Sequence, residues 1–195
     1  MAVENARIVS DSLRLLETLG ALPEPAAKPF FIVVSGLPGT GKSFFCRKLT
    51  ERLPVVLLES DAIRKILFPY PVYTAAESSY LFRVLHLLLE KLLLQGISVV
   101  LDATNLSEGN REHLYNIADR LEVKLIIVRI SAPPELVRQR LHARAGVVTE
   151  KSDADWEVYR KMEPAVEDIR RKHYSVDTSR DVTPAIEKIV REALR

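Results

Sequence analysis

The residues with the clearest chemical potential lie between an apolar run, residues 30–34, and a predicted helix that begins near residue 41. Residues 36–43 read GLPGTGKS, which fits the pattern G-x-x-x-x-G-K-[S/T] at every fixed position. Glycines let consecutive backbone N–H groups turn toward an anion, and a helix start adds unpaired N–H groups and a positive dipole end. A Gly-rich turn without a ligand is the alternative, but the flanking strand and helix favour a phosphate-binding loop.

Within this loop the lysine and the serine suit different partners. The Lys42 ammonium is expected to reach the β- and γ-phosphates of a nucleotide, and the Ser43 hydroxyl to hold Mg²⁺. The predicted nucleotide contacts are Gly36, Leu37, Pro38, Gly39, Thr40, Gly41, Lys42, Ser43 and Phe44.

A carboxylate and a guanidinium follow the second predicted strand. Asp61 and Arg64 are three residues apart on a first helical turn, so both side chains lie on one face. The carboxylate could accept the proton of an attacking hydroxyl, and the guanidinium could hold a phosphate or the carboxylate itself. A helix cap with a solvated arginine is the alternative that these two residues leave open.

A second carboxylate, Asp102, ends the apolar run at residues 97–101. Beside a phosphate loop, this position is typical of a residue that supports the Mg²⁺ ligands, although a strand-end cap is the alternative. Thr104 and Asn105 are expected to line an acceptor pocket or simply to form a turn. Arg111 is expected on a solvated helix face rather than at an acceptor anion.

Two arginines precede a segment without periodicity. Arg140 and Arg144 are four residues apart, where like charges repel unless an anion lies between them. We expect a lid at about 144–155 that closes over the phosphates, neutralises charge and excludes water. Salt bridges to Glu135 or Glu150 are the alternative.

These side chains need a scaffold, and the chain alternates strands with helices from residue 30 onward. The predicted strands are 30–35, 55–58, 97–101, 123–130 and 174–178, and the predicted helices are 41–53, one beginning near 60, 74–95, 108–121, 133–144, 153–173 with a bend at Pro164, and 184–194. Such alternation gives an α/β fold with a parallel sheet covered on both faces. Ligands then bind beyond the carboxyl ends of the strands, where the candidate residues stand.

The N-terminal residues 1–28 form a separate predicted unit, a helix at 3–19 followed by a proline-rich linker, and residues 29–195 form the main domain. The helix could pack on the domain or on a second copy, giving a homodimer. The net charge of +2 makes no bulk case for nucleic acid. One cysteine, Cys46, and the lack of a signal or membrane-spanning pattern predict a cytoplasmic protein without membrane attachment.

With these elements placed, the chain resembles P-loop kinases of the group of AAA-type predicted ATP-binding kinases and the 5′-hydroxyl polynucleotide kinase domain. The resemblance rests on residues 36–43, on Asp61 and Arg64 as a D-x-x-R motif, and on residues 102–106. It implies a three-layer P-loop NTPase fold with strand order 2-3-1-4-5. It also implies Asp61 as general base, Arg64 at the acceptor, lid arginines at 140 and 144, and adenine near residues 174–183.

Residues and resemblance together predict an ATP- and Mg²⁺-dependent phosphotransferase acting on a hydroxyl. Its predicted catalytic residues are Lys42, Asp61, Arg64, Arg140 and Arg144, with Asp61, Arg64, Asp102, Thr104 and Asn105 binding the acceptor and Ser43 and Asp102 at the metal. No lysine or arginine lies between residues 66 and 79, which favours a small acceptor over a polynucleotide. A 5′-hydroxyl polynucleotide kinase, or a nucleotide-binding switch without catalysis, are the alternatives.

Overall fold

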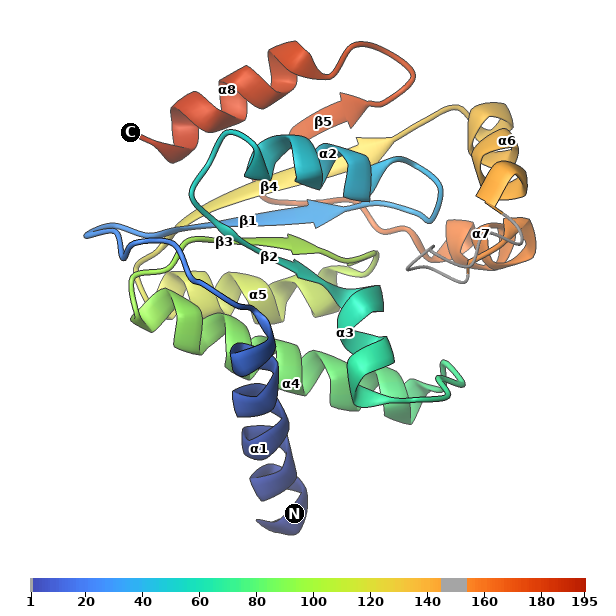
Figure 1. Cartoon of the computed structure of the whole chain (residues 1–195). Helices are drawn as coiled ribbons and strands as arrows, with labels where there is room; N and C mark the ends of the chain where they lie inside the picture. Colours follow the sequence, from blue (N-terminus) through green and yellow to red (C-terminus); the bar gives the residue numbers. More distant parts are fainter. Residues whose placement is uncertain (1, 145–153) are drawn as a thin grey trace.

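The computed structural model of the chain, which describes residues 2–144 and 154–195, is built on one parallel sheet. The strands are β1 (Phe30–Ser35), β2 (Val56–Glu59), β3 (Val99–Asp102), β4 (Lys124–Ser131) and β5 (Tyr174–Asp177). They pair in the order β2-β3-β1-β4-β5, which confirms the predicted topology. Because all pairs are parallel, the carboxyl ends of the strands share one edge of the sheet (Figure 1).

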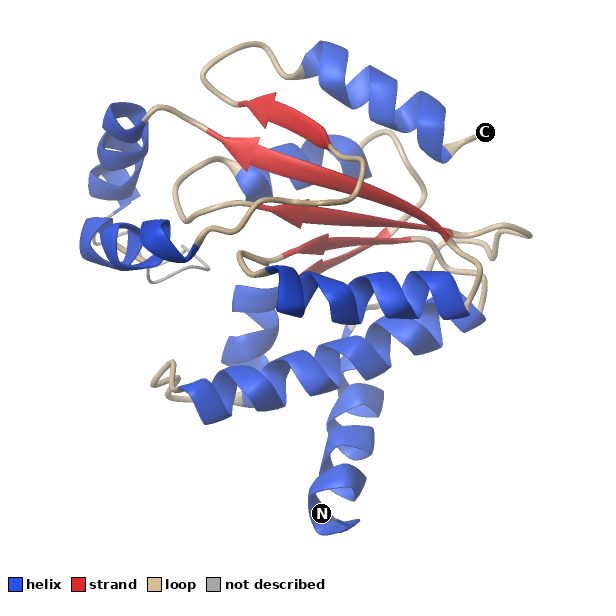
Figure 2. Cartoon of the chain, turned by 180° about the vertical axis from the view of Figure 1, so that it is seen from behind, coloured by secondary structure: helices blue, strands red, loops and turns tan. Residues whose placement is uncertain are grey.

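The central strand β1 is buried on both faces, which explains its uninterrupted apolar sequence. Phe31 and Val33 pack into the cluster that contains α4 (Ala75–Leu94) and α5 (Glu108–Arg120). The alternate residues Ile32 and Val34 pack against α2 (Lys42–Thr50) and α8 (Thr183–Ala193). Figure 2 shows the resulting layers, with α2 and α8 on one face of the sheet and α4 and α5 on the other. The three-layer α/β prediction is therefore confirmed.

The N-terminal helix α1 (Ala2–Thr18) packs on α4 of its own chain. Its buried residues Ile8 and Leu15 belong to the α4-side core. The Tyr80 hydroxyl donates to Asp11 at 2.6 Å. The Arg14 guanidinium donates to the Ile66 carbonyl of α3 (Ser60–Leu67) at 2.9 Å. The sequence left open whether this helix packs on its own domain or on a second copy, and in the structure it packs on its own domain. None of the described helices is long and apolar enough to span a membrane.

The segment after the predicted lid differs from expectation. The helix predicted over 153–173 is much shorter: α7 spans Trp156–Met162 and a 3₁₀ turn covers Glu163–Ala165. Pro164 has no N–H to continue the helix, and the Glu167 N–H instead donates to the Leu106 carbonyl at 3.0 Å. Residues 166–173 therefore run as an irregular strap toward β5. Helix α6 (Pro134–Arg144) precedes the lid predicted at about 144–155, of which residues 145–153 lie outside the described part of the chain.

Candidate active site

The phosphate-binding loop joins β1 to α2 and has backbone angles that its glycines permit. Gly41 caps α2 with φ 95°, in the left-handed region, which favours glycine. A side chain on Gly39, φ 77°, would also come within 2.8 Å of Val137 on α6. The Thr40 hydroxyl donates to the Leu37 carbonyl at 2.7 Å and closes the turn. The loop thus makes the glycine-dependent turn that the sequence pattern predicts.

Lys42, the first residue of α2, lies across this loop. Its ammonium donates to the Leu37 carbonyl at 3.0 Å. Burial lowers its pKa, and the carboxylates of Asp102 and Asp61 act in the opposite direction. The ammonium is therefore held between the loop and two acidic groups, in a position where the charge of a phosphate would favour its protonated form.

Ser43, in the first turn of α2, and Asp102, at the end of β3, form a pair of oxygen ligands. The parallel register puts Asp102 opposite Val34, just before the loop. Burial raises the pKa of Asp102, while the Lys42 charge and a hydrogen bond from the Ser43 hydroxyl lower it. A hydroxyl beside a carboxylate, both lining an open cleft, suits Mg²⁺, which prefers oxygen ligands and keeps several of its own waters.

Asp61 lies in the first turn of α3, and its charge also acts on Lys42. It lines the same cleft, which has a volume of about 850 Å³, and no hydrogen bond to its carboxylate is found among the residues that the structure describes. Asp61 and Asp102 are far apart in the sequence. The pairing of β2 with β3 puts Glu59 opposite Asp102, and Asp61 follows Glu59 by two residues.

Arg64 is the predicted site residue whose position differs most from expectation. It is 7% exposed and does not line the cleft. Its guanidinium donates to the Glu77 carboxylate at 2.7 Å and to the Ser78 hydroxyl at 3.2 Å. It also lies 4.8 Å from the centre of the Tyr73 ring. The arginine therefore joins α3 to the start of α4.

Thr104 and Asn105 have different surroundings although they are adjacent. Thr104 lines the cleft, and its carbonyl accepts from the Gly36 N–H at 3.1 Å. Asn105 is 2% exposed, has φ 46° and does not line the cleft. Its carbonyl accepts from the Ser35 hydroxyl at 3.0 Å. The turn alternative fits the geometry of Asn105, while Thr104 is open to a ligand.

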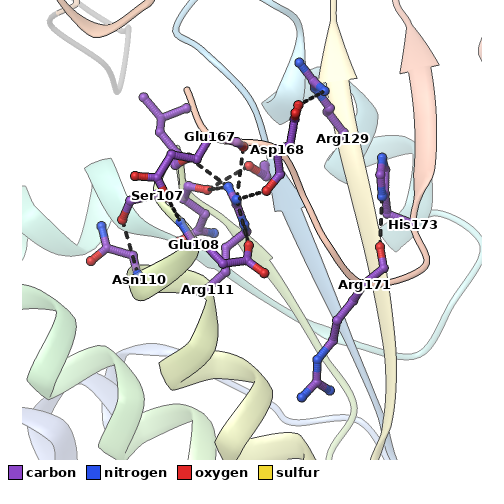
Figure 3. Close-up of polar contacts among 12 residues, drawn as sticks. Ser107, Glu108, Asn110, Arg111, Arg129, Glu167, Asp168, Arg171 and His173 are labelled. Carbon is purple, nitrogen blue, oxygen red and sulfur yellow. Dashed lines mark hydrogen bonds and ion pairs between the residues drawn. The ribbon is translucent and has the colours of Figure 1, made fainter. Parts of the chain in front are cut away.

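Arg111 was expected to be solvated, and this prediction is wrong. Only 1% of it is exposed. Figure 3 shows its guanidinium among backbone carbonyls from two separate segments of the chain. These acceptors are Asn105 and Leu106 at 2.8 Å each, Glu167 at 3.0 Å and Asp168 at 2.8 Å, with the Glu108 carboxylate at 2.8 Å. Helical periodicity could not reveal this role, because the partners are backbone groups of an irregular strap.

Arg140 and Arg144 both line the cleft from α6. The Arg140 guanidinium donates to the Thr178 hydroxyl at 2.8 Å and to the Thr178 carbonyl at 3.0 Å. The Thr178 hydroxyl in turn donates to the Thr40 carbonyl at 2.6 Å. A chain of hydrogen bonds thus links α6, the segment after β5 and the phosphate loop. Sequence reasoning did not single out Thr178.

The structure brings most of the predicted residues to one cleft. Those that line it are Pro38, Gly39, Gly41, Lys42, Ser43, Phe44, Asp61, Asp102, Thr104, Arg140 and Arg144. Gly36, Leu37 and Thr40 line a smaller cavity of about 100 Å³ behind the loop. Arg64 and Asn105 line neither cavity.

Comparison with solved structures shows proteins with the same fold. A gluconokinase from Sinorhizobium meliloti superposes with a TM-score of 0.57 at 24% identity, over 85% of this chain and 90% of that one. The Mycobacterium tuberculosis APS kinase CysC, in complex with AMPPNP and APS, gives a TM-score of 0.61 at 19% identity, over 85% and 98% of the two chains. At these identities the likeness concerns the fold.

Sequence comparison gives a more specific relationship. The L-seryl-tRNA(Sec) kinase of Methanococcus maripaludis is 26% identical over 114 residues, which are 56% of this chain and 44% of that protein. The chain thus matches less than half the length of this curated relative. The model of the AAA_33 family, described as an AAA domain, matches residues 31–169 and includes the phosphate loop, Asp61 and Asp102. The chain therefore belongs to the AAA_33 family of kinase-like P-loop domains.

Proposed function

We propose that the chain is an ATP- and Mg²⁺-dependent phosphotransferase that moves the γ-phosphate to a hydroxyl of a small molecule. The observation that carries this proposal is the convergence of Lys42, Ser43, Asp102 and Asp61 on one cleft of about 850 Å³. A volume in this range is large enough for a nucleotide together with part of an acceptor. A switch protein needs the first three residues but has no use for the additional carboxylate.

In this proposal each side chain has a limited task, because phosphoryl transfer depends mainly on positioning and charge stabilisation. Lys42 leaves the Leu37 carbonyl and binds the β- and γ-phosphates. Ser43 and Asp102 would hold Mg²⁺, which would neutralise phosphate charge. Asp61 orients the acceptor hydroxyl and takes up its proton.

The arginines act from the outer wall of the cleft. Arg140 donates to Thr178, and we assign it a contact with the nucleotide; Arg144 follows one turn later on α6. Their positive charge would oppose the negative charge of the transferring phosphoryl group. We assign Arg64 a structural role in place of the expected contact with the acceptor. Through its ion pair with Glu77 it holds α3, the helix of Asp61, in position.

A small acceptor is preferred because residues 66–79 contain no lysine or arginine for a phosphate chain. The related enzymes named above include a gluconokinase and an APS kinase, which act on small molecules, and an L-seryl-tRNA(Sec) kinase, which acts on a tRNA. Arg47 and Arg180, which are exposed and line the cleft, favour a 5′-hydroxyl polynucleotide as second candidate. We also propose a cytoplasmic location. We further propose that the chain can form a homodimer through α1, where Val9 and Leu13 are exposed apolar side chains.

Transfer from γ-labelled ATP tests the proposal. Purified protein with Mg²⁺ is offered a pool of small hydroxyl compounds and, separately, a 5′-hydroxyl oligonucleotide, with Lys42→Ala as the blank. Label in the small-molecule pool supports the proposal. Label on the oligonucleotide, lost steeply as salt rises, supports the second candidate. Label in neither, with ATP still bound, supports the non-catalytic alternative and contradicts the phosphotransferase.

A further inference from the structure

Thr178, the first residue after β5, is hydrogen-bonded to three separate segments at the carboxyl edge of the sheet. Its N–H donates to the Ser131 carbonyl at the end of β4 at 2.9 Å. Its hydroxyl donates to the Thr40 carbonyl of the phosphate loop at 2.6 Å and accepts from the Arg140 guanidinium of α6 at 2.8 Å. In both overall views α6 lies beyond the carboxyl ends of β4 and β5 (Figures 1 and 2). Thr178 thus joins the sheet, the loop and α6.

The direction of these hydrogen bonds follows from the chemistry of the groups. A guanidinium has no acceptor atom, so the Thr178 oxygen accepts from Arg140 and gives its single proton to a carbonyl. The Thr40 carbonyl, at 2.6 Å, is the stronger of two acceptors, since the Ser131 carbonyl lies 3.4 Å from the same oxygen. Arg140 also donates to the Thr178 carbonyl at 3.0 Å. Loop, threonine and guanidinium are therefore held in one relative arrangement.

The bond to Thr40 also fixes a donor of the phosphate loop. The Thr40 carbonyl and the Gly41 N–H belong to one peptide unit, which is planar and trans, so the two groups point in opposite directions. Gly41 is one of the predicted nucleotide contacts. The Thr178 side chain packs closely against it, because a Cβ on Gly41 would lie 3.0 Å from the Thr178 Oγ1. The hydroxyl of Thr178 thus determines how this loop N–H is presented.

Arg140 keeps donors for a ligand while it stays bound to Thr178. A guanidinium has five N–H groups, and Thr178 takes two of them. Arg140, Thr178 and Gly41 line the same cleft. A long side chain that is already fixed loses less conformational entropy when a ligand binds. The arrangement is therefore suited to receive phosphate oxygens.

We propose that Thr178 is a positioning residue for the phosphates of the nucleotide. Its hydroxyl holds the Arg140 guanidinium and the Gly41 N–H in the arrangement that binds them. This inference rests on the proposed phosphotransferase function, which assigns Arg140 to the nucleotide. Thr178 acts through these two groups, so that loss of its hydroxyl weakens phosphate binding.

Calorimetric binding of AMPPNP with Mg²⁺ tests the inference without requiring turnover. Thr178→Val keeps the branched shape of the side chain and removes the hydroxyl, and the Kd should rise about tenfold, as expected for a lost hydrogen bond to a charged group. Thr178→Ser restores the hydroxyl and should stay within about threefold of wild type. Thr18→Val is the matched control, because the exposed Thr18 hydroxyl donates to the Leu15 carbonyl at 2.7 Å on α1, and it should bind as wild type does.

A double-mutant cycle tests whether Thr178 acts through Arg140. In an Arg140→Ala background, Thr178→Val should raise the Kd by less than about threefold, because the guanidinium that it positions is gone. Arg140→Lys leaves the hydrogen bond from Thr178 to the loop in place but loses the planar fork, and it should raise the Kd by about fivefold or more. In the transfer assay Thr178→Val should lower kcat about tenfold while the acceptor KM stays within about twofold.

Three results would overturn the inference: wild-type affinity in Thr178→Val, a Thr178→Ser variant as weak as Thr178→Val, or the full tenfold loss in the Arg140→Ala background. If Thr178→Val does not fold, wild-type affinity in Arg140→Lys would overturn it in the same way. Nucleotide binding that follows the expected pattern without any labelled product would keep the role of Thr178 and refute the phosphotransferase, so the two failures are distinguishable.

Discussion

The Arg111 guanidinium donates to the backbone carbonyl of Asn105 at 2.8 Å, and both residues are almost completely buried. The Ser35 hydroxyl donates to the same carbonyl. Arg111 also binds the carbonyls of Glu167 and Asp168 in the strap that follows α7. One side chain thus fixes the loop after β3 to the end of β1 and to the strap that precedes β5.

Replacing Arg111 should therefore destabilise the whole domain. Arg111→Lys is expected to lower the free energy of unfolding by on the order of 3 kcal/mol, because an ammonium cannot reproduce the planar fork that reaches all these acceptors. Urea unfolding measures the change. Arg120→Lys is the matched control, since Arg120 pairs with Glu90 at the surface, and it should lower the free energy of unfolding much less than Arg111→Lys. Equal losses for both variants would contradict the role given to Arg111.

The buried pair of Arg64 and Glu77 makes a second stability prediction. Glu77→Gln leaves the guanidinium buried without a counter-charge and should cost on the order of 3 kcal/mol. Glu51→Gln, which alters an exposed pair with Lys48, should cost less than about 1 kcal/mol. Denaturant unfolding of the two variants compares them. If Glu77→Gln lowers the free energy of unfolding no more than Glu51→Gln does, the buried pair does not stabilise the junction between α3 and α4.

His86 gives a prediction for pH. It lies on α4 beside Phe82 and His113 of α5, with 5.7 Å between the imidazole ring centres. Burial, with a smaller contribution from His113, lowers its pKa from 6.5 to about 4. Between these values the unfolded chain binds a proton that the folded chain does not, so stability should fall as the pH falls from 6.5 to 4. The slope from this one group is at most about 1.4 kcal/mol per pH unit.

Urea unfolding at several pH values measures this slope in wild type and in His86→Leu. The variant should show the smaller loss of stability between pH 6.5 and 4. His142→Leu, at an exposed position on α6, should keep the wild-type slope. An unchanged slope in His86→Leu would show that His86 is not buried as a neutral imidazole.

Ser43 is expected to couple nucleotide binding to Mg²⁺. Wild type should bind ATP more tightly with Mg²⁺ than with EDTA, and Ser43→Ala should lose at least about tenfold of that gain. In EDTA the two proteins should bind ATP with similar affinity, because the phosphate loop and Lys42 are intact. Calorimetric titration measures both conditions. Ser10→Ala, an exposed serine on α1, is the control. A full Mg²⁺ effect in Ser43→Ala would remove Ser43 from the metal site.

Sequence patterns predicted the fold well, because the patterns that indicate its strands, helices and loops each lie within a short segment. The run of apolar residues in β1, the loop glycines and Asp102 at a strand end each follow from a few neighbouring residues. Arg64 and Arg111 were misplaced because their partners lie far along the chain. Arg64 meets Glu77, which is 13 residues away, and Arg111 meets carbonyls at 167 and 168 in a strap that looked helical. A buried arginine and a solvated one have the same helical spacing, so periodicity could not separate them.

The measurement that tests the central claim most directly compares Asp61→Asn with wild type in two assays. One is calorimetric binding of Mg²⁺·ATP, and the other is phosphate transfer to the acceptor labelled in the screen. The account predicts unchanged ATP affinity and a loss of transfer of at least about 100-fold, since the amide cannot take up the proton of the hydroxyl. Transfer at the wild-type rate by Asp61→Asn would contradict the account, because the cleft would then work without its proposed base.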